Sequence, residues 1–266
     1  MKKLDKFGHC LEEYTSNKNN AQVYYNRAIG KSPEMEVSKA LAKIVKKITK
    51  KNYRILDVGC ACGHYYKSLK REIKNNFYYT GIDPYKIFLD KAKAAWKNEK
   101  NVNFKKGNIF DLPLDNREFD IVVCNNVLLH LPSIEKPLRE LIRVSKKTVI
   151  LRTVVYDVSY KIQLVYNSKW WKGTNIKPVN EFDKMGNPNS FSYFNIHSFD
   201  YLKGLVGKID KKLKIKFVKD NFFSKKNIQS SIKKEKRPLA TRVVGDEQFS
   251  GCLMQPHYFV IINKQK

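Results

Sequence analysis

The chain has 266 residues, of which 42% are hydrophobic, enough for a sizeable core and near the upper end of the single-domain range. No apolar run approaches the length of a membrane span, and Asp5, Lys6 and His9 interrupt any signal-peptide core, so we expect a cytoplasmic protein. The five cysteines are scattered and odd in number, which favours free thiols over a zinc site or a disulfide framework.

The formal net charge of +27 makes nucleic acid a candidate partner. Only nine of the 52 basic residues are arginines, however, and arginine is favoured where planar, bidentate contacts to phosphates or bases are needed. We therefore interpret most of the charge as solvated surface. The exception is a basic face over 203–237, where thirteen lysines and arginines are interleaved with three phenylalanines and could meet a phosphate-bearing partner. The alternative is an ordinary strand over 213–217 with one solvated face.

A buried strand is predicted over 53–58, followed by a tight turn of small residues and a helix that begins at His64. Gly59 and Gly63 let the backbone turn sharply and approach a ligand. A second strand over 77–82 leads to Asp83, whose carboxylate is placed to accept hydrogen bonds from a ribose diol. The pattern predicts a nucleotide-type cofactor. The alternatives are an ordinary turn for the glycines and a helix N-cap for Asp83, ahead of Pro84.

Three further strands are expected over 102–106, 119–124 and 146–152, with helices between them. One of these helices is predicted over 134–145, with Ser133 as its N-cap. Alternation of strands and helices predicts a parallel sheet, and ligands of such sheets bind at the carboxyl ends of the strands.

The turn also indicates the kind of cofactor. The string Asp57-Val58-Gly59-Cys60-Ala61-Cys62-Gly63 resembles the Asp-x-Gly-x-Gly-x-Gly signature of class I S-adenosylmethionine (SAM)-dependent methyltransferases, with Ala61 in place of the middle glycine. A dinucleotide fold would show Gly-x-Gly-x-x-Gly instead. Three segments follow in the order that this family requires: 81–84 resembles its ribose-binding strand end, 107–113 its adenine-binding segment, and 119–132 its fourth strand with the loop beside the methionine moiety.

The resemblance implies a Rossmann-like, doubly wound α/β sheet of seven strands, mostly parallel, with an antiparallel last strand and an inserted substrate lid. A helix near 198–206 and an antiparallel pair near 213–219 and 257–263 would complete it. It implies SAM as cofactor, S-adenosylhomocysteine as product and no metal. Asn108 would meet the adenine through its amide oxygen, and Ile109 through its backbone amide. The cofactor-binding residues implied are Asp57, Gly59, Cys60, Ala61, Gly63, Asp83, Pro84, Asn108, Ile109, Asn125 and, for the SAM carboxylate, Arg27.

Length and composition predict a single domain, and subtraction of the expected core divides it into four parts. We expect an N-terminal helical cap over 1–40, a SAM-binding core over 41–153, an acceptor-side insert over 154–197, and a completion of the sheet with a basic loop over 198–266. The insert is rich in aromatic residues, and Tyr156, Trp170 and Trp171 are candidate acceptor contacts. Alternatively, these aromatic residues fill a small core of the insert itself.

Methyl transfer from a sulfonium depends mostly on placement and exclusion of water. A hydroxyl acceptor would also need a base, and histidine is best matched to neutral pH. His130, His197 and His257 are the candidates, each with a structural alternative. Arg152, at the end of the fifth strand, is a candidate for holding a carboxylate or phosphate of the acceptor, or else forms a surface ion pair.

The fourth strand is followed by Asn125-Asn126-Val127-Leu128 rather than the Asn/Asp-Pro-Pro-Tyr/Phe tetrapeptide of amide- and base-directed N-methyltransferases. We therefore expect methylation at oxygen of a small, anionic or sugar-like acceptor such as a glycan precursor. The alternatives are an RNA methyltransferase that uses the basic face, and a non-catalytic SAM-binding partner subunit.

Overall fold

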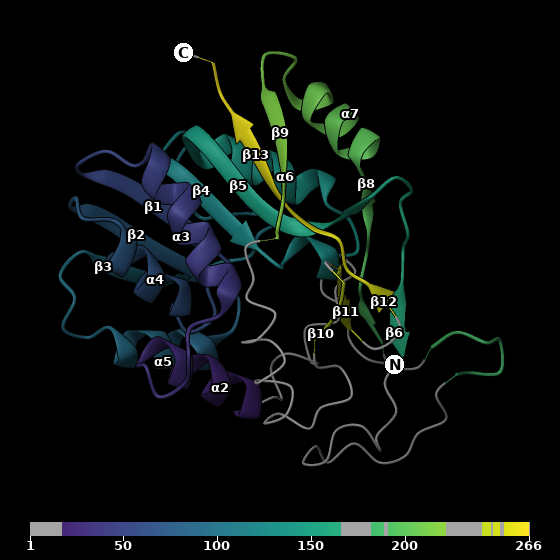
Figure 1. Cartoon of the computed structure of the whole chain (residues 1–266), viewed down its shortest axis with the longest axis horizontal. Coiled ribbons are helices and arrows are strands. Elements are labelled where there is room, and N and C mark those ends of the chain that lie inside the picture. The colour runs from purple at the N-terminus through teal and green to yellow at the C-terminus, as the bar shows by residue number, and fades with distance from the viewer. Residues whose placement is uncertain are drawn as a thin grey trace.

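A seven-stranded path of one large sheet forms the centre of the computed structural model, which describes residues 18–165, 182–188, 191–221, 241–245, 247–250 and 253–265 (Figure 1). All neighbours pair in parallel except β13, which is antiparallel to both β5 and β9. The predicted Rossmann-like sheet is therefore confirmed, including its closing antiparallel pair. In spatial order the strands are β3 (Val102–Lys106), β2 (Phe77–Asp83), β1 (Tyr53–Val58), β4 (Phe119–Asn125), β5 (Ser145–Tyr156), β13 (His257–Asn263) and β9 (Lys214–Lys219).

Helices cover both faces of this sheet because successive strand residues point to opposite sides. Ile55, Ile121 and Ile150 pack with α3 (Glu36–Ile48), α4 (His64–Glu72) and α5 (Lys86–Ala95) on one face. Leu56 and Val122 pack with α6 (Glu135–Val144) and α7 (Phe199–Ile209) on the other. An additional helix, α2 (Lys18–Ala28), lies against α4 and α5 (Figure 1).

Two element boundaries differ from the sequence-based expectation. The N-cap residue of α6 is Ile134, without a side-chain cap, so Ser133 does not have the predicted role. The fifth strand continues to Tyr156, because β13 pairs with it as far as Val154 and the short strand β8 (His197–Ser198) pairs with its last two residues. The hydroxyl of Ser198 then caps α7 by accepting from the Tyr201 amide at 3.1 Å.

The described part of the 154–197 insert packs against the loop that follows β4. Its β6 (Gln163–Val165) and β7 (Phe191–Tyr193) form an antiparallel pair. Next to this pair, Phe194 and Ile196 join a small apolar cluster with Leu129. A separate three-stranded sheet consists of β10 (Thr241–Val244), β11 (Glu247–Ser250) and β12 (Leu253–Met254). None of the described helices is both long and apolar enough to cross a membrane.

Asp57 lies inside the sheet, where its side chain accepts a hydrogen bond from the Tyr79 hydroxyl at 2.6 Å. Burial raises the pKa of Asp57 to about 7, against the effect of the Tyr79 bond and with a further contribution from the charge of Asp83. This carboxyl group therefore titrates close to neutrality in the folded protein.

We expect the Asp57→Asn variant to gain stability relative to the wild type as the pH rises from 5 to 8. The unfolded carboxyl ionises near 3.8 and the folded one near 7, so the stability that protonated Asp57 gives the wild type is lost over this range. Since one pKa unit corresponds to about 1.4 kcal/mol, the difference in unfolding free energy should grow by about 2 to 3 kcal/mol, measurable by urea unfolding.

Asp120→Asn is the matched control. Burial raises the pKa of Asp120, but hydrogen bonds from the Arg54 amide and Lys147 lower it below its usual value of 3.8. Both its folded and its unfolded transitions thus lie below pH 5, and the difference from wild type should stay flat between pH 5 and 8. An equally flat difference for Asp57→Asn would contradict the raised pKa.

Candidate functional site

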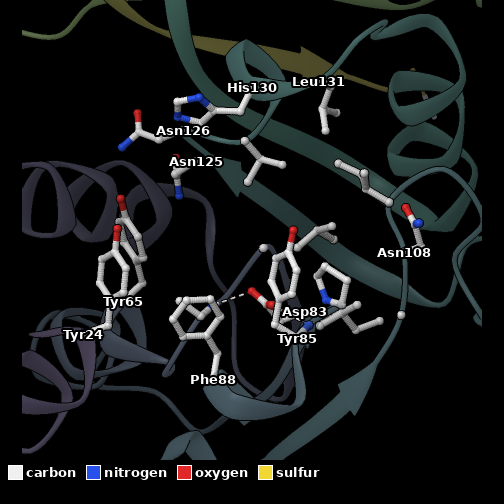
Figure 2. A pocket seen from close by; sticks show the side chains of 18 of the residues that line it. Tyr24, Tyr65, Asp83, Tyr85, Phe88, Asn108, Asn125, Asn126, His130 and Leu131 are labelled. Carbon is white, nitrogen blue, oxygen red and sulfur yellow. Dashed lines mark hydrogen bonds between the residues drawn. The ribbon is translucent and has the colours of Figure 1, made fainter. Parts of the chain in front are cut away.

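A cavity of about 220 Å³ opens at the carboxyl ends of β1, β2 and β4, where ligands of parallel sheets bind (Figure 2). Figure 2 shows Asn125, Asn126 and His130 on one side of it, with Asp83 and Tyr85 on the other. Among the described lining residues, Asp83 is the only one with a formally charged side chain, because no lysine, arginine or glutamate contributes. The residues that line the cavity include Tyr24, Gly59, Ala61, His64, Tyr65, Asp83, Pro84, Asn108, Ile109, Phe110, Asn125, Asn126, His130 and Leu131.

The turn after β1 forms the floor of this cavity. Gly59 has a φ of 79°, and a Cβ there would lie 2.4 Å from Cγ2 of Val127, so no larger residue fits. Ala61 also adopts a positive φ, 46°, a conformation that favours glycine and has a cost for alanine. The turn nevertheless keeps its shape, because the Ala61 amide donates to Oδ2 of Asp83 at 2.9 Å.

Asp83 is a buried carboxylate whose two oxygens can each accept a further hydrogen bond. Its other oxygen, Oδ1, accepts from the Tyr85 amide at 3.0 Å, and the side chain is only 4% exposed. Burial raises its pKa to about 6, although both amide bonds favour the ionised form. Each carboxylate oxygen can accept a second hydrogen bond, so Asp83 can also receive the two hydroxyls of a ribose.

Two buried polar side chains in the lining are left unpaired. Within the described structure, neither the amide atoms of Asn125 nor the ring nitrogens of His64 have a hydrogen-bond partner, and both residues are 6% exposed. An unpaired buried polar group costs about 1–3 kcal/mol, so unpaired groups facing one cavity indicate a polar ligand. This cavity thus fits SAM, which has polar groups at its methionine end.

His64 is a site residue that the sequence analysis missed. Its ring stacks on Tyr24, with centroids 5.1 Å apart, and contacts Tyr65 at 4.6 Å. Burial, together with the positive charge of Arg27, lowers its pKa to about 3, so it is neutral at physiological pH. The available signal was a polar residue directly after Gly63, at the start of a helix whose first residue lines the cavity.

His130 is the candidate base that reaches the cavity. It lies on the 3-10 turn η1 (Leu128–His130), and its Nδ1 is 2.9 Å from the Tyr193 carbonyl oxygen. Because a carbonyl can only accept, Nδ1 carries the hydrogen and Nε2 carries the lone pair of the neutral ring.

The other two candidate histidines lie elsewhere. His197 and His257 are buried at strand positions and do not line the cavity. Burial lowers the pKa of His197 to about 4, and that of His257 well below its usual value, so both are neutral at physiological pH. The sequence could not separate these three histidines, because their distances from the cavity depend on tertiary packing.

Arg152 does not face the acceptor crevice as expected, and it does not form a surface ion pair either. It is buried, with Nε and Nη2 each 2.7 Å from Oδ2 of Asp220, and it donates through Nη1 to Oδ1 of Asn126 at 2.5 Å. A buried charge needs such a partner, and Asp220 is 68 residues away in sequence. The guanidinium therefore supports Asn126, which has a φ of 56° and lines the cavity.

The remaining predicted residues divide between the cavity lining and its surroundings. Asn108, Ile109 and Pro84 line the cavity, and Oδ1 of Asn108 accepts from the Phe110 amide at 3.1 Å. Asp57, Cys60, Gly63 and Arg27 lie around it without lining it, and Tyr156 is exposed at the end of β5. Trp170 and Trp171 fall outside the described residues. No cluster of potential metal ligands occurs in the part of the chain that the structure describes.

Comparison with known proteins gives a consistent family. Residues 49–184, about half of the chain, match the family model described as "Methyltransferase domain". An uncharacterized methyltransferase of Schizosaccharomyces pombe is 29% identical over 168 residues, which cover 56% of this chain and 60% of that protein. A ubiquinone biosynthesis O-methyltransferase of Coxiella burnetii is 30% identical over 121 residues, or 45% of this chain and 50% of the relative. The alignments thus span about half to three fifths of these relatives.

Solved structures add agreement on the fold. The magnesium protoporphyrin IX methyltransferase of Synechocystis, determined with bound SAH, superposes with a TM-score of 0.56. The match covers 95% of this chain and 99% of that one, at 11% identity. At this identity the likeness shows a shared architecture and no more.

We expect Asp83→Ala to weaken SAM binding by about 10- to 100-fold, because hydrogen bonds to a charged group contribute about 1.5–3 kcal/mol each. Calorimetric titration with SAM measures the change. Asp90→Ala is the control, since Asp90 lies on the neighbouring α5 and only pairs with Lys86 at the surface. Unchanged affinity in the Asp83 variant would remove this carboxylate from the site.

His64→Phe should make the protein more stable and its SAM binding weaker. The phenyl ring keeps the stacking on Tyr24 but removes two unpaired buried nitrogens, a gain of about 1 kcal/mol or more in thermal or urea unfolding. Losing a hydrogen bond to the ligand should raise the SAM dissociation constant about tenfold.

His197→Phe is the control for this variant, because His197 also has a buried unpaired nitrogen but lies outside the cavity. It should leave SAM affinity unchanged. A His64→Phe protein that binds SAM like the wild type would show that His64 is only a packing residue.

Proposed function

We propose that this chain, which belongs to the methyltransferase-domain family, is a SAM-dependent methyltransferase that methylates a hydroxyl oxygen of a small, sugar-like acceptor. The observation that carries the proposal is the position of the His130 ring in the cavity and the hydrogen bond that it forms. Its Nδ1 lies 2.9 Å from the Tyr193 carbonyl oxygen, which assigns the ring hydrogen to Nδ1 and makes Nε2 the nitrogen that would accept a proton. A hydroxyl acceptor needs such a base, and histidine can supply it near neutral pH.

The residues that would hold the cofactor fall into two groups. Asp83 would bind the ribose, and His64 and Asn125 would meet polar groups at the methionine end. Ile109, Phe110 and Leu131 would form the apolar wall beside the adenine. When bound, SAM supplies a methyl group on a positively charged sulfur.

On the acceptor side, we propose that Nε2 of His130 would take the proton of the attacking hydroxyl. The oxygen would form its new bond to the methyl carbon as the bond from that carbon to the sulfur breaks, so that S-adenosylhomocysteine is the leaving group. The proton is then released to solvent. The amide of Asn126, held from behind by Arg152, would orient the acceptor through a hydrogen bond. The apolar lining lowers the water content around the reacting groups, which favours transfer over side reactions.

The cavity supports a neutral acceptor better than an anionic one. Among its described lining residues no cationic side chain is available, and the guanidinium of Arg152 is committed to Asp220. The relative named ubiquinone biosynthesis O-methyltransferase supports transfer to oxygen. In the described half of the basic face, Lys203, Lys208 and Lys219 are in ion pairs with acidic groups, which favours a solvated surface over an RNA site.

We expect methyl label from radioactive SAM to enter the low-mass or glycan fraction of a cell extract, and His130→Gln to reduce the rate of transfer by about 100-fold or more. Glutamine retains a side chain that can donate to the Tyr193 carbonyl but provides no base. SAM affinity should stay unchanged, because His130 acts on the acceptor.

His257→Gln serves as the control for loss of a buried histidine that does not line the cavity, and it should retain transfer. Label in the RNA fraction would show that the acceptor is RNA and not a small molecule. Full transfer by His130→Gln would show that no histidine base is needed.

A further inference from the structure

The turn that carries His130 has little support of its own. It is a three-residue 3-10 helix without a side-chain cap, closed by the bond from the His130 amide to Val127 O at 2.9 Å and a longer one at 3.2 Å. Short 3-10 turns have poorer hydrogen-bond geometry than α-helices, so their shape depends on contacts from outside. Figure 2 shows His130 and Leu131 at the edge of the cavity, where any movement of this turn would displace the ring.

Asn195, a residue of the insert that is 4% exposed, makes two hydrogen bonds to this turn. Its backbone amide donates to Leu129 O at 2.8 Å, and its side-chain Nδ2 donates to Leu131 O at 2.7 Å. These two bonds hold the chain immediately before and immediately after His130. On its other side, Oδ1 of Asn195 accepts from the Ile162 amide at 3.3 Å, which connects the residue to the chain just before β6.

The same segment of the insert contacts the imidazole itself. Tyr193, two residues before Asn195, offers the carbonyl that fixes the His130 tautomer at 2.9 Å. Phe194, between them, packs edge-on against the ring with centroids 6.0 Å apart and an interplanar angle of 69°. Residues 193–195 therefore hold both the backbone and the ring of His130.

We propose that Asn195 is a positioning residue for His130, through which the insert sets the direction of the Nε2 lone pair. This inference rests on the proposed role of His130 as base. The hydrogen bond from Nδ1 to a backbone carbonyl also becomes charge-assisted once Nε2 has taken a proton, so a correctly placed Tyr193 carbonyl stabilises the imidazolium. Asn195 keeps that carbonyl and the turn at a fixed distance from each other.

The test replaces Asn195 by leucine, which has a similar size but neither donates nor accepts. Asn195→Leu should lower kcat for transfer by at least tenfold and leave the SAM dissociation constant unchanged. In the His130→Gln background the same substitution should have no further effect on kcat, because a positioning residue acts only through the group it positions. Asn195→Gln, which keeps the amide, should recover part of the lost rate.

A readout that does not need turnover is the nitrogen NMR spectrum of His130. The wild type should show the Nδ1–H tautomer, and Asn195→Leu should change the tautomer ratio or the pKa of this ring. Asn187→Leu is the matched control, since Asn187 lies in the same insert and only bonds to Asp183 at an exposed turn.

The outcomes distinguish the two proposals. An unchanged His130 spectrum in a folded Asn195→Leu protein, or an equal loss of kcat in the presence and absence of His130, would overturn the positioning role. Full transfer by His130→Gln would overturn the proposed base itself. If thermal unfolding shows that Asn195→Leu does not fold, the His130 spectrum of Asn195→Gln tests the positioning role instead. The longer side chain of this variant should still shift the His130 signals.

Discussion

The hydrogen bonds between the end of β2 and the turn after β1 fix the geometry on which the cavity depends. Asp83 accepts from the amides of Ala61 and Tyr85, and the carbonyl of Ile82 accepts from the amides of Gly59 and Cys60 at 2.8 and 3.1 Å. These bonds satisfy backbone donors that the turn would otherwise bury unpaired. They also stabilise Ala61 in a conformation that alanine rarely adopts, so the turn tolerates the loss of its middle glycine.

The parts of the fold that the sequence could predict are those with a local signal. The central strands are short apolar runs, and Gly59 and Asp83 follow two of them directly, so their order and the cofactor end of the cavity could be predicted. The acceptor end depends on pairs that are distant in the sequence, such as Arg152 with Asp220 and His130 with Tyr193, 68 and 63 residues apart. The periodicity of the sequence does not indicate which distant residues form such pairs. The sequence therefore could not distinguish His130, His197 and His257 as candidate bases.

The two ends of the cavity differ in how their polar groups are satisfied. At the Asp83 end the protein itself provides hydrogen bonds, whereas His64 and Asn125 have none within the described structure. Unpaired buried polar atoms destabilise the folded protein, so a residue that has them and faces a cavity indicates ligand binding more than a packing role. The neutral state of His64 fits this explanation, because a neutral ring presents one donor and one acceptor and so can meet both charged groups of an amino acid.

The position of β13 has a consequence for the way the sheet is completed during synthesis. This strand pairs with β5 on one side and β9 on the other, yet it follows both in the chain. Until residues 257–263 leave the ribosome, β5 has an open edge towards β13 and β9 has no partner in the sheet. Exposed strand edges are prone to pairing with other chains. A nascent chain that stalls before β13 is synthesised would therefore expose the edges of β5 and β9 to pairing with other chains. It would depend on chaperones more than the finished protein does.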